Sequence, residues 1–429
     1  MRVFIKTFGC KVNSFESSAM AELLRARGCE AAASEAESDA VIVNSCTVTD
    51  RGDQKTRQYL RRVKRENPDC LLVLAGCFPQ AFPEKAANIP EADLVCGTGS
   101  REQTLEALFR CLEDRRRRVE ILPNRDLAYE PLSAAEPDGH TRAFLKIEDG
   151  CERFCSYCIV PFARGPVRCL PLEDLKTQAA QTAARGFSEI VLTGINLSCY
   201  GQGQGFDLVD AVAAASLPEG IKRVRLGSLE PDMLGEEMLD RLALETKLCA
   251  HFHLSLQSGC DATLKRMNRR YTAAEYLKTA GLIRERFERA VFTTDIIAGF
   301  PGESESEFSE SLAFAESFGF LKIHVFPYSP REGTAAARMP GQIEKSVKEA
   351  RAALLSEAGE RSRERVLRSF VGSRARVILE RQRPDGSFGG YTDRYLPARV
   401  RGEGLRERDV VEGEIRALEN GECVVEPRA

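Results

Sequence analysis

The sequence predicts an α/β protein in three parts: an N-terminal open parallel sheet with helices, a central partial (β/α)6 barrel and a small C-terminal antiparallel β-barrel. Three observations predict this fold class. Short apolar runs alternate with amphipathic helical stretches over most of the chain, which is typical of parallel sheets. An irregular stretch with two prolines interrupts the alternation. Short strands separated by Gly and Asp turns then follow a long charged helix, which indicates a small barrel.

The first predicted domain covers residues 1–122. Its expected strands are RVFIKTF, AVIVNS, LLVLAG, ADLVCG and VEILP, and its helical stretches include ESSAMAELLRARG and QKTRQYLRRVKRENP. This alternation predicts a parallel sheet with helices on both faces. Residues 124–142 have no clear period, so we expect a linker there.

The second predicted domain covers residues 137–368. Its expected strands are AFLKIED, EIVLTGI, RVRLGS, FHLSLQ, VFTTDIIAG and KIHVFPYS, with helices between them, and a charged helix spans about 341–369. Six strands with interleaved helices predict an open, incomplete barrel. Residues 370–429 form the third domain, whose strands lie in RARVILER, GGYTDRYLPARV, VVEGEIRAL and ECVVEP.

The composition limits the class of protein. A hydrophobic content of 43% with 29% charged residues is typical of a globular chain. No run of 18 apolar residues is present, and the N-terminus does not resemble a signal peptide. We therefore expect a cytoplasmic protein with no membrane partner. Fifteen cysteines against four histidines favour thiolate-bound metal over a disulfide framework.

Cys151, Cys155 and Cys158 lie in D-G-C-E-R-F-C-S-Y-C-I-V-P, directly after a predicted strand. This spacing lets one loop place three thiolates on three corners of a cuboidal iron–sulfur cluster. An electron-transfer cluster of this type uses four cysteines, so the missing fourth ligand leaves one iron open to S-adenosylmethionine (SAM). A zinc knuckle and three buried cysteines are the alternatives, and both fit this position less well.

The C-x3-C-x2-C motif at the start of a barrel resembles that of the radical SAM superfamily. In barrels of this kind, ligand groups gather at the C-terminal ends of the strands. The resemblance therefore implies SAM contacts at the following strand ends: Thr193, Gly194, Glu230, Ser255, Gln257 and Gly299.

Cys10, Cys46 and Cys77 each end or closely follow a predicted strand of the first domain. Loops beyond the carboxyl ends of strands share one edge of an open α/β sheet, so these three thiols can meet at one site. Cys96 also follows a strand and is the obvious rival or fourth ligand. The alternative is that small buried cysteines simply pack in the sheet, and the pattern alone does not decide between the two.

The stretches T-F-G-C-K-V-N, N-S-C-T-V-T and L-A-G-C resemble the N-terminal domain of the radical SAM methylthiotransferase family. This resemblance covers essentially the whole chain. It implies that Cys10, Cys46 and Cys77, without Cys96, hold an auxiliary cluster, so that the protein uses two [4Fe–4S] clusters and SAM. It also implies that residues 370–429 form a TRAM domain, an OB-like RNA-binding module.

Within this family, the form C-K-V-N resembles the MtaB-like group, whereas the MiaB-like group more often has Gln-Met in place of Lys-Val. The segments C-I-V-P-F-A-R-G-P-V-R, H-L-S-L-Q-S-G and H-V-F-P-Y-S-P also resemble the MtaB-like group. Cys169 departs from that group, which usually has serine, and we interpret it as a bystander.

The resemblance implies methylthiolation of carbon 2 of threonylcarbamoyladenosine at position 37 of tRNA. The implied partners are the tRNA anticodon stem-loop and an electron donor such as flavodoxin or ferredoxin. Alternative substrates are isopentenyladenosine in tRNA and an aspartate of a small-subunit ribosomal protein. A non-catalytic RNA-binding iron–sulfur protein is the alternative from a different class.

Several cationic and aromatic side chains are candidate RNA contacts. Arg57, Arg61 and Arg65 repeat every four residues on one face of a predicted helix, and Arg115–Arg118 form a basic run. A solvated helix face is the simpler interpretation of each basic stretch taken alone. Tyr391, Tyr395 and Phe388 can stack on bases, although ordinary barrel core is a slightly better explanation of them.

Overall fold

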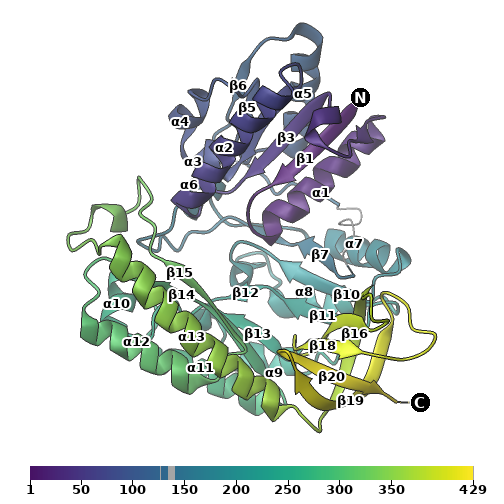
Figure 1. Ribbon diagram of the computed structural model, residues 1–429, viewed down its shortest axis with the longest axis vertical. Helices are drawn as coiled ribbons and strands as arrows, with labels where there is room; N and C mark the ends of the chain where they lie inside the picture. The colour runs from purple at the N-terminus through teal and green to yellow at the C-terminus, as the bar shows by residue number, and fades with distance from the viewer. Residues whose placement is uncertain (126, 134–140, 429) are drawn as a thin grey trace.

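A computed structural model of the chain describes residues 1–125, 127–133 and 141–428. The three predicted parts follow one another in the expected order (Figure 1). The N-terminal sheet lies at one end of the molecule, the open barrel lies below it, and the small closed barrel lies beside the open one. The predicted fold class is confirmed.

The N-terminal part contains a six-stranded sheet in the order β2-β1-β3-β4-β5-β6, and every neighbouring pair is parallel. Its elements are β1 Arg2–Thr7, α1 Lys11–Ala26, β2 Glu30–Ala31, a 3-10 turn Glu35–Glu37, β3 Ala40–Ser45, α2 Asp50–Glu66, β4 Leu71–Gly76, α3 Cys77–Ala81, α4 Pro83–Ala87, β5 Leu94–Cys96, α5 Arg101–Asp114 and β6 Arg118–Glu120.

Helices cover both faces of this sheet because its central strands β3 and β4 are buried at every position. The side chains of α1 and α5, such as Leu24 and Leu108, pack on one face. Those of α2, such as Leu60 and Val63, pack on the other. The helices that follow β1 and β3 therefore lie on opposite faces, which makes the gap between these strands a topological switch point. Ligands of open α/β sheets bind at such points.

The central part is an open barrel of parallel strands. Its two sheets, β11-β10-β7 and β12-β13-β14-β15, follow one another around the barrel. Its elements are β7 Ala143–Lys146, β8 Glu148–Asp149, α6 Val160–Arg164, β9 Arg168–Cys169, α7 Leu172–Ala184, β10 Glu189–Thr193, α8 Leu208–Ser216, β11 Arg223–Leu226, β12 Ser228–Leu229, α9 Glu236–Ala243, β13 His251–Leu254, α10 Asp261–Arg266, α11 Ala273–Arg286, β14 Val291–Ala298, α12 Glu305–Phe318, β15 Lys322–Pro327 and α13 Lys345–Ser369, with 3-10 turns at Leu197–Cys199, Pro231–Met233 and Ala336–Arg338.

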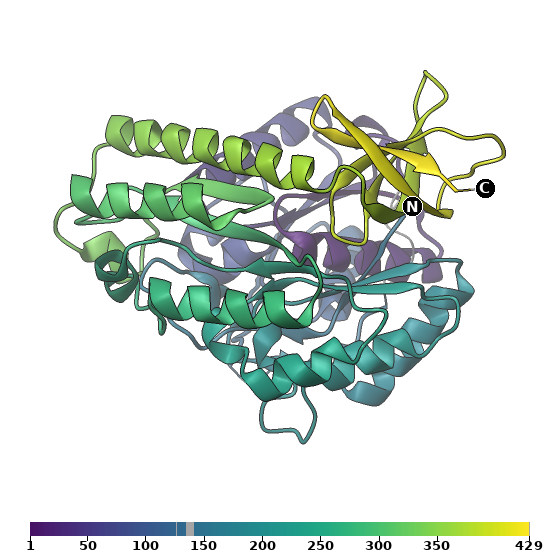
Figure 2. The ribbon, with the colours of Figure 1, turned by 90° about the horizontal axis from the view of Figure 1, so that it is seen from below.

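Helices α11, α12 and α13 lie along the outer surface of this barrel, with the N-terminal part behind it in Figure 2. One large buried cluster joins the outward faces of the strands to these helices. The predicted linker forms no helix or strand at its described positions, but it is packed. Leu132 lies against Phe15 and Ala19 of α1. Residues 126 and 134–140, among them residue 137 where we placed the domain boundary, lie outside the described residues.

The C-terminal part is a closed five-stranded barrel in the order β16-β17-β18-β20-β19. Its strands are β16 Arg374–Gln382, β17 Phe388–Thr392, β18 Pro397–Val400, β19 Val410–Glu419 and β20 Glu422–Pro427. The barrel is not wholly antiparallel as predicted, because β18 and β20 run parallel. A closed ring with an odd number of strands cannot alternate direction throughout, so one neighbouring pair must be parallel.

Two buried arginines attach the closed barrel to the open one. Arg223 and Arg225 of β11 both pair with the buried carboxylate of Glu189 in β10. Arg223 also donates to the main-chain carbonyls of residues 376 and 391, and Arg225 to those of residues 392 and 393, at 2.9–3.2 Å. Among the helices of the described chain, none combines the length and apolar character needed to cross a bilayer.

Candidate active site

Cys10, Cys46 and Cys77 lie at the carboxyl ends of β1, β3 and β4, which are neighbours in the sheet. Cys10 is the residue before α1, and Cys77 is the first residue of α3. Because the switch point lies between β1 and β3, the loops there leave space above the sheet edge. The fold thus brings together three thiols that are 36 and 31 residues apart in the chain.

Two glycines allow the loops carrying these thiols to approach each other. Gly9 has a φ of +142°, and a β-carbon at this position would lie 2.9 Å from the β-carbon of Cys46. Gly76 has a φ of +97°, and its added β-carbon would lie 2.5 Å from Oδ1 of Asn44. No real β-carbon tolerates such contacts, so both loops require glycine.

Buried amides fix the loop of Cys10 against β3. Asn13 donates to Oδ1 of Asn44 at 3.3 Å and to the carbonyl of Ser45 at 3.2 Å. Asn44 donates back to the carbonyl of Asn13 at 3.0 Å. Asn13 also accepts a hydrogen bond from the thiol of Cys10 at 3.2 Å. The network holds the first and second cysteine loops in one arrangement.

Two thiols of this site, Cys46 and Cys77, are poor acids by themselves. Burial, together with the charges of Cys77 and Cys10, raises the pKa of Cys46 to about 12. Burial also raises the pKa of Cys77, although the guanidinium of Arg164 opposes this and donates to its Sγ at 3.2 Å. These thiols ionise only if a metal binds them, because metal binding releases the proton.

Arg164 belongs to a largely buried ion cluster between the N-terminal sheet and the open barrel. Three acids, Glu16, Asp149 and Glu130, face four cations: Arg101, Lys146, Arg164 and Arg168. The cluster therefore holds more positive than negative charge next to Cys77. A thiolate-bound iron–sulfur cluster adds negative charge, so the surroundings of Cys77 fit such a group.

Cys151, Cys155 and Cys158 lie in the loop after β8. The loop turns sharply at Phe154, whose φ is +48°, and closes with a hydrogen bond from the N–H of Cys158 to the carbonyl of Cys155 at 2.9 Å. Arg269 donates to Sγ of Cys155 at 3.2 Å. Asn196 lies 3.9 Å from Sγ of Cys151. These N–H donors suit sulfur atoms that carry negative charge.

Burial raises the pKa of Cys151 to about 11 and that of Cys158 to about 12. These thiols also need a metal to ionise. Among the described residues, no three cysteines have sulfur atoms all within 4.8 Å of one another. Neither cysteine set is therefore arranged to chelate a single ion such as zinc, whereas a four-iron cluster holds its thiolates further apart. Both sets supply the donor type that the predicted clusters require.

The predicted SAM contacts fall into separate groups. Thr193 and Gly194 line a large cavity, and Gln257 lines a smaller cavity beside Cys158. Glu230 is paired with Arg269, which also contacts Cys155, and lies 3.9 Å from Arg153. Ser255 is buried, and its carbonyl accepts from the hydroxyl of Tyr271 at 2.6 Å.

Gly299, the sixth predicted contact, lies in the turn after β14. Its φ is +71°, and its N–H donates to the carboxylate of Glu303 at 2.8 Å. Neither cavity is lined by Gly299. The structure therefore gives it a role in the turn, and its contact with SAM stays a prediction.

The large cavity, of about 660 Å³, receives residues from all three parts of the chain. Cys10 lies on its N-terminal wall, Thr193 and Gly194 on the open barrel, and Tyr391 with Tyr395 on the closed barrel. A second cavity of about 200 Å³ lies beside Cys158 and is lined mainly by apolar side chains such as Tyr157 and Ile297. Asp295 and Phe326 line both cavities, so these cavities are neighbours.

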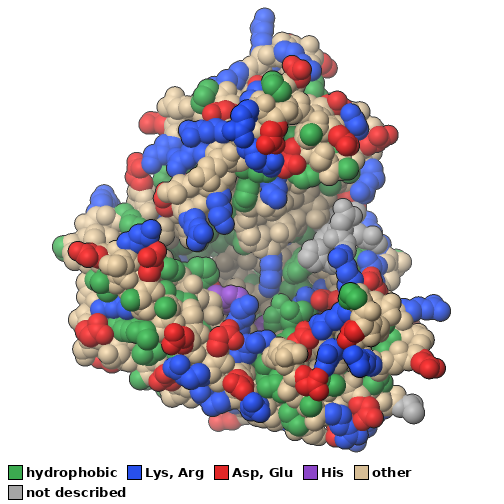
Figure 3. Space-filling model, in the orientation of Figure 1, with side chains coloured by type: hydrophobic (Ala, Val, Ile, Leu, Met, Phe, Trp, Pro, Cys, Tyr) green, Lys and Arg blue, Asp and Glu red, His purple; other side chains and the backbone are tan. Residues whose placement is uncertain are grey.

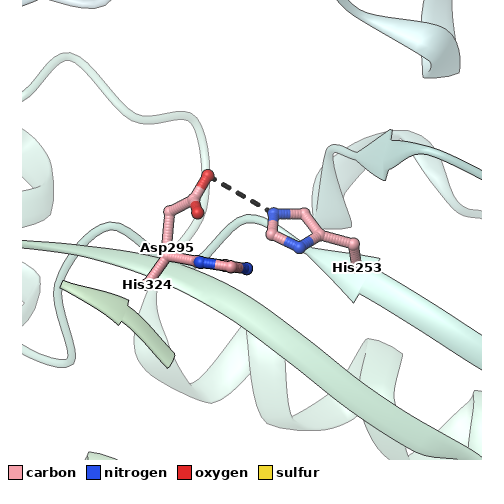
Figure 4. Close-up of side chains that lie close together, drawn as sticks. All are labelled: His253, Asp295 and His324. Carbon is pink, nitrogen blue, oxygen red and sulfur yellow. Dashed lines mark hydrogen bonds and ion pairs between the residues drawn. The ribbon is translucent and has the colours of Figure 1, made fainter. Parts of the chain in front are cut away.

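The sequence analysis missed three polar residues on the floor of the large cavity, His253, Asp295 and His324, which lie together on β13, β14 and β15 (Figure 4). Nε2 of His253 is 3.3 Å from Oδ2 of Asp295, and the three residues offer ligand atoms within 4.8 Å of one another. The one signal for them in the sequence is a polar residue inside an otherwise apolar strand. Figure 3 shows histidine at the bottom of the hollow between the upper and lower parts of the molecule.

The three aromatic candidates for RNA stacking separate into two kinds. Phe388 is buried in the core of the closed barrel. Tyr391 and Tyr395 stack on each other at 4.7 Å and face the cavity, with the guanidinium of Arg142 over both rings. Only these two tyrosines are placed to meet a ligand in the cavity.

Two further cysteines are buried in hydrophobic cores. Cys96 packs in the core formed by β5 and α5, where burial raises its pKa to about 12. Cys169 is buried, and its Sγ accepts from the N–H of Gly201 at 3.2 Å. Each has a place in the hydrophobic core, which agrees with their interpretation as bystanders.

The arginines of the two basic stretches differ in whether they have partners within the protein. Arg61 lies 3.4 Å from Glu91 and Arg65 lies 3.9 Å from Glu66, whereas Arg57 forms no ion pair or hydrogen bond with any other described residue. In the run Arg115–Arg118, Arg117 donates to main-chain carbonyls of residues 87, 89 and 92. The run Arg115–Arg118 therefore stabilises the fold, whereas Arg57 of α2 is free to bind another molecule.

Comparison with known families assigns the two thiol sites to two domains. Residues 2–97 match the uncharacterized protein family UPF0004, and residues 145–315 match the radical SAM superfamily. The chain also resembles solved structures of the radical SAM methyltransferase TsrM from Kitasatospora setae (TM-score 0.56, 15% identity, 77% of this chain and 74% of that one) and the cobalamin-dependent enzyme OxsB (TM-score 0.53, 14% identity, 85% and 56%). At these identities the likeness concerns the fold alone.

The open barrel with its three-cysteine loop is thus a radical SAM domain. The chain is 36% identical to the threonylcarbamoyladenosine tRNA methylthiotransferase MtaB of Bacillus subtilis (93% of this chain, 90% of that protein) and 34% identical to MtaB of Thermotoga maritima (92% and 90%). It is 33% identical to the tRNA-2-methylthio-N(6)-dimethylallyladenosine synthase of Alkaliphilus oremlandii (88% and 82%). The chain belongs to the radical SAM tRNA methylthiotransferase family.

Proposed function

We propose that this enzyme transfers a methylthio group to carbon 2 of threonylcarbamoyladenosine at position 37 of tRNA, with SAM as methyl donor and radical source. The large cavity carries this proposal. It places Cys10 of one thiol site and Thr193 and Gly194 of the radical SAM barrel around one space. A single base in that space can meet both the radical and the sulfur.

In this proposal, Cys151, Cys155 and Cys158 hold one [4Fe–4S] cluster, and Cys10, Cys46 and Cys77 hold the other. When bound, the first cluster supplies the electron that cleaves SAM to methionine and a 5′-deoxyadenosyl radical, and the second supplies sulfur. A radical is required because a C–H bond on an aromatic ring is too inert for acid–base chemistry at neutral pH.

The residues of the chain position and shield these groups. Arg269 and Asn196 donate to the sulfurs of the first site, and Arg164 donates to the second. The small apolar cavity beside Cys158 suits the adenine ring of SAM, and we retain Thr193, Gly194, Glu230, Ser255, Gln257 and Gly299 as proposed SAM contacts.

Substrate choice rests on the relatives named for threonylcarbamoyladenosine. Relatives named for dimethylallyladenosine are of similar identity, so isopentenyladenosine is the second candidate. We propose that the anticodon stem-loop is held by the closed barrel, residues 370–429, and by the N-terminal domain, residues 1–122, on either side of the radical SAM core, residues 137–368. A flavodoxin or ferredoxin supplies electrons.

The substrate is tested by nucleoside analysis of tRNA from a strain that lacks this gene. Methylthio-threonylcarbamoyladenosine disappears in the deletion strain and returns when the gene is restored. If that nucleoside persists while methylthio-isopentenyladenosine disappears, the second candidate is correct. If neither changes, the substrate is not a tRNA adenosine of these two types.

Iron content and SAM cleavage test the two cluster sites. The anaerobically purified enzyme should carry about eight irons if both sites hold [4Fe–4S] clusters. Cys155→Ala abolishes SAM cleavage and leaves about four irons, and Cys46→Ala leaves about four irons with SAM cleavage intact. Cys96→Ser is the matched control and keeps about eight. A wild-type enzyme with about four irons would refute the second site, and one that never cleaves SAM would be the non-catalytic RNA-binding protein.

A further inference from the structure

Two lysines from different parts of the chain line the large cavity without an anionic partner. Lys11 is the first residue of α1 and Lys322 the first of β15. Both are exposed, and neither forms an ion pair or hydrogen bond with another described residue. The third cation of the lining, Arg363, is occupied, because it donates to the carbonyl of Gly421 at 2.9 Å and lies 3.6 Å from Glu360.

Both lysines act on one place in the cavity. Burial lowers the pKa of His324, Asp295 opposes this, and the charges of His253, Lys322 and Lys11 lower it further. The two ammonium groups are thus both within electrostatic range of the same imidazole. A small anion in the space beside His324 would be attracted by both.

The sign of the charge decides what kind of ligand this place can take. The geometry of His253, Asp295 and His324 resembles that of a divalent metal site. Arg363 and Glu360 in the cavity lining pair with each other at 3.6 Å. The remaining charged side chains of the lining are two ammonium groups and the one carboxylate of Asp295, so a metal cation there would meet more positive than negative charge. The surplus of positive charge favours an anion instead.

We propose that Lys11 and Lys322 form a carboxylate-binding subsite, and that it takes the carboxylate of the threonylcarbamoyl group on the substrate base. The inference rests on the proposed function and specifies how the substrate is chosen. An isopentenyl group is an uncharged hydrocarbon, so two ammonium groups in the cavity lining form no favourable electrostatic interaction with it. A threonylcarbamoyl group ends in a carboxylate, which pairs with ammonium in a charge-assisted hydrogen bond.

The position of Lys11 agrees with the chemistry of the base. Carbon 2 and the N6 substituent of adenine flank N1 on the same edge of the ring. A base that presents carbon 2 to the sulfur held near Cys10 therefore carries its N6 substituent past the neighbouring wall. Lys11 follows Cys10 directly in the chain and lines that wall.

A backbone phosphate of the tRNA has the same charge chemistry as a carboxylate, so the test must separate these two sources. The probes are three anticodon stem-loops, whose position 37 carries threonylcarbamoyladenosine, its carboxylate methyl ester, or plain adenosine. The esterified probe loses the charge and keeps the shape. Dissociation constants are measured with the anaerobic holoenzyme, as wild type and as Lys11→Met, Lys322→Met and Lys278→Met.

Wild type binds the acid about 10- to 100-fold more tightly than the ester, the range of one charged hydrogen bond. Lys11→Met and Lys322→Met each reduce this ratio to a few-fold and leave the affinity for plain adenosine unchanged. Lys278→Met, at an exposed lysine on α11, keeps the wild-type ratio. Iron content and SAM cleavage equal to wild type show that Lys11→Met has not disturbed Cys10, and Lys322→Met is remote in sequence from every proposed ligand.

Other results would overturn the inference. Equal weakening of all three probes by either substitution would mean that the lysine meets a phosphate. Equal affinity of the wild type for acid and ester would mean that no carboxylate subsite exists. Tighter binding of zinc than of the acid probe in the same cavity would mean the same. Failure of the proposed function is seen separately, because wild type would then form no methylthio product on the acid stem-loop.

Discussion

Single residues decide whether the second thiol site can form. Gly9 and Gly76 precede Cys10 and Cys77 and both adopt positive φ angles. Their absent side chains leave room for Cys46 and Asn44. The site therefore depends on what these positions lack as much as on the thiols themselves.

Gly9→Ala is expected to abolish the second site while the first survives. The new methyl group would overlap the β-carbon of Cys46, and the backbone would be strained as well. Iron content should fall to about half, with SAM cleavage retained. Gly28→Ala is the matched control, because Gly28 also has a positive φ but no atom within 4 Å of an added β-carbon. Full iron content in Gly9→Ala would contradict this account.

At the residue scale, the thiols could be predicted and the cavity floor could not. Cys151, Cys155 and Cys158 are close in sequence, so their spacing alone indicates a site. His253, Asp295 and His324 belong to three strands far apart in the chain, and the space they face exists only once three domains meet. Lys11 was visible only as part of a family resemblance, and its place in the cavity comes from the structure.

At the scale of elements, strand positions followed from apolar runs with little error, and β3 and β4 have the predicted bounds. Helix α1 begins five residues before the predicted stretch, because its N-cap is Cys10, which makes no side-chain capping bond and so gives no capping signal. The stretch GGYTDRYLPARV forms two strands, β17 and β18. They are separated by a turn in which Tyr395 has a φ of +64°. Tyrosine rarely adopts this conformation, so the sequence gives no signal for the turn.

Helix α2 makes a testable contribution to RNA binding through Arg57, a cation that pairs with no other described residue. Arg57→Ala should lower the slope of log affinity for tRNA against log salt by about 1, because one phosphate contact is lost. Arg117→Ala is the control: its guanidinium binds main-chain carbonyls, so its loss should lower thermal stability and leave the slope unchanged. The measurement is tRNA binding over a series of salt concentrations. An unchanged slope in Arg57→Ala would mean that this face of α2 does not meet RNA.

At the scale of the whole molecule, one buried carboxylate holds two domains together. Burial by itself would raise the pKa of Glu189, but Arg225, Arg223 and Arg142 outweigh it and bring the pKa to about 2. Arg223 and Arg225 also donate hydrogen bonds to the closed barrel. The domain contact therefore depends on the charge of Glu189.

The free energy of unfolding should depend on pH through this group. The pKa of Glu189 is about 2 in the folded chain and about 4.3 in the unfolded chain, so its contribution, about 3 kcal/mol, is present above pH 4.3 and lost as pH falls towards 2. Glu189→Gln should lower stability at pH 7, and its curve should converge with wild type near pH 2.

Urea unfolding of the cluster-free chain between pH 7 and pH 2.5 measures this difference. Glu403→Gln, at an exposed position, should follow the wild-type curve throughout. Parallel curves for wild type and Glu189→Gln over the whole range would show that the pKa of Glu189 is not lowered by folding.

The hydrogen bonds from Arg223 and Arg225 to the closed barrel go to peptide carbonyls, which every amino acid carries, and Arg225 also lies 5.0 Å from the ring centre of Tyr395. The side chains at positions 376, 391, 392 and 393 are therefore not what the two arginines recognise. Replacing those side chains leaves the attachment in place, provided that the backbone keeps its path. The surface offered to a nucleic acid can thus diverge between relatives without a matching change on the open barrel.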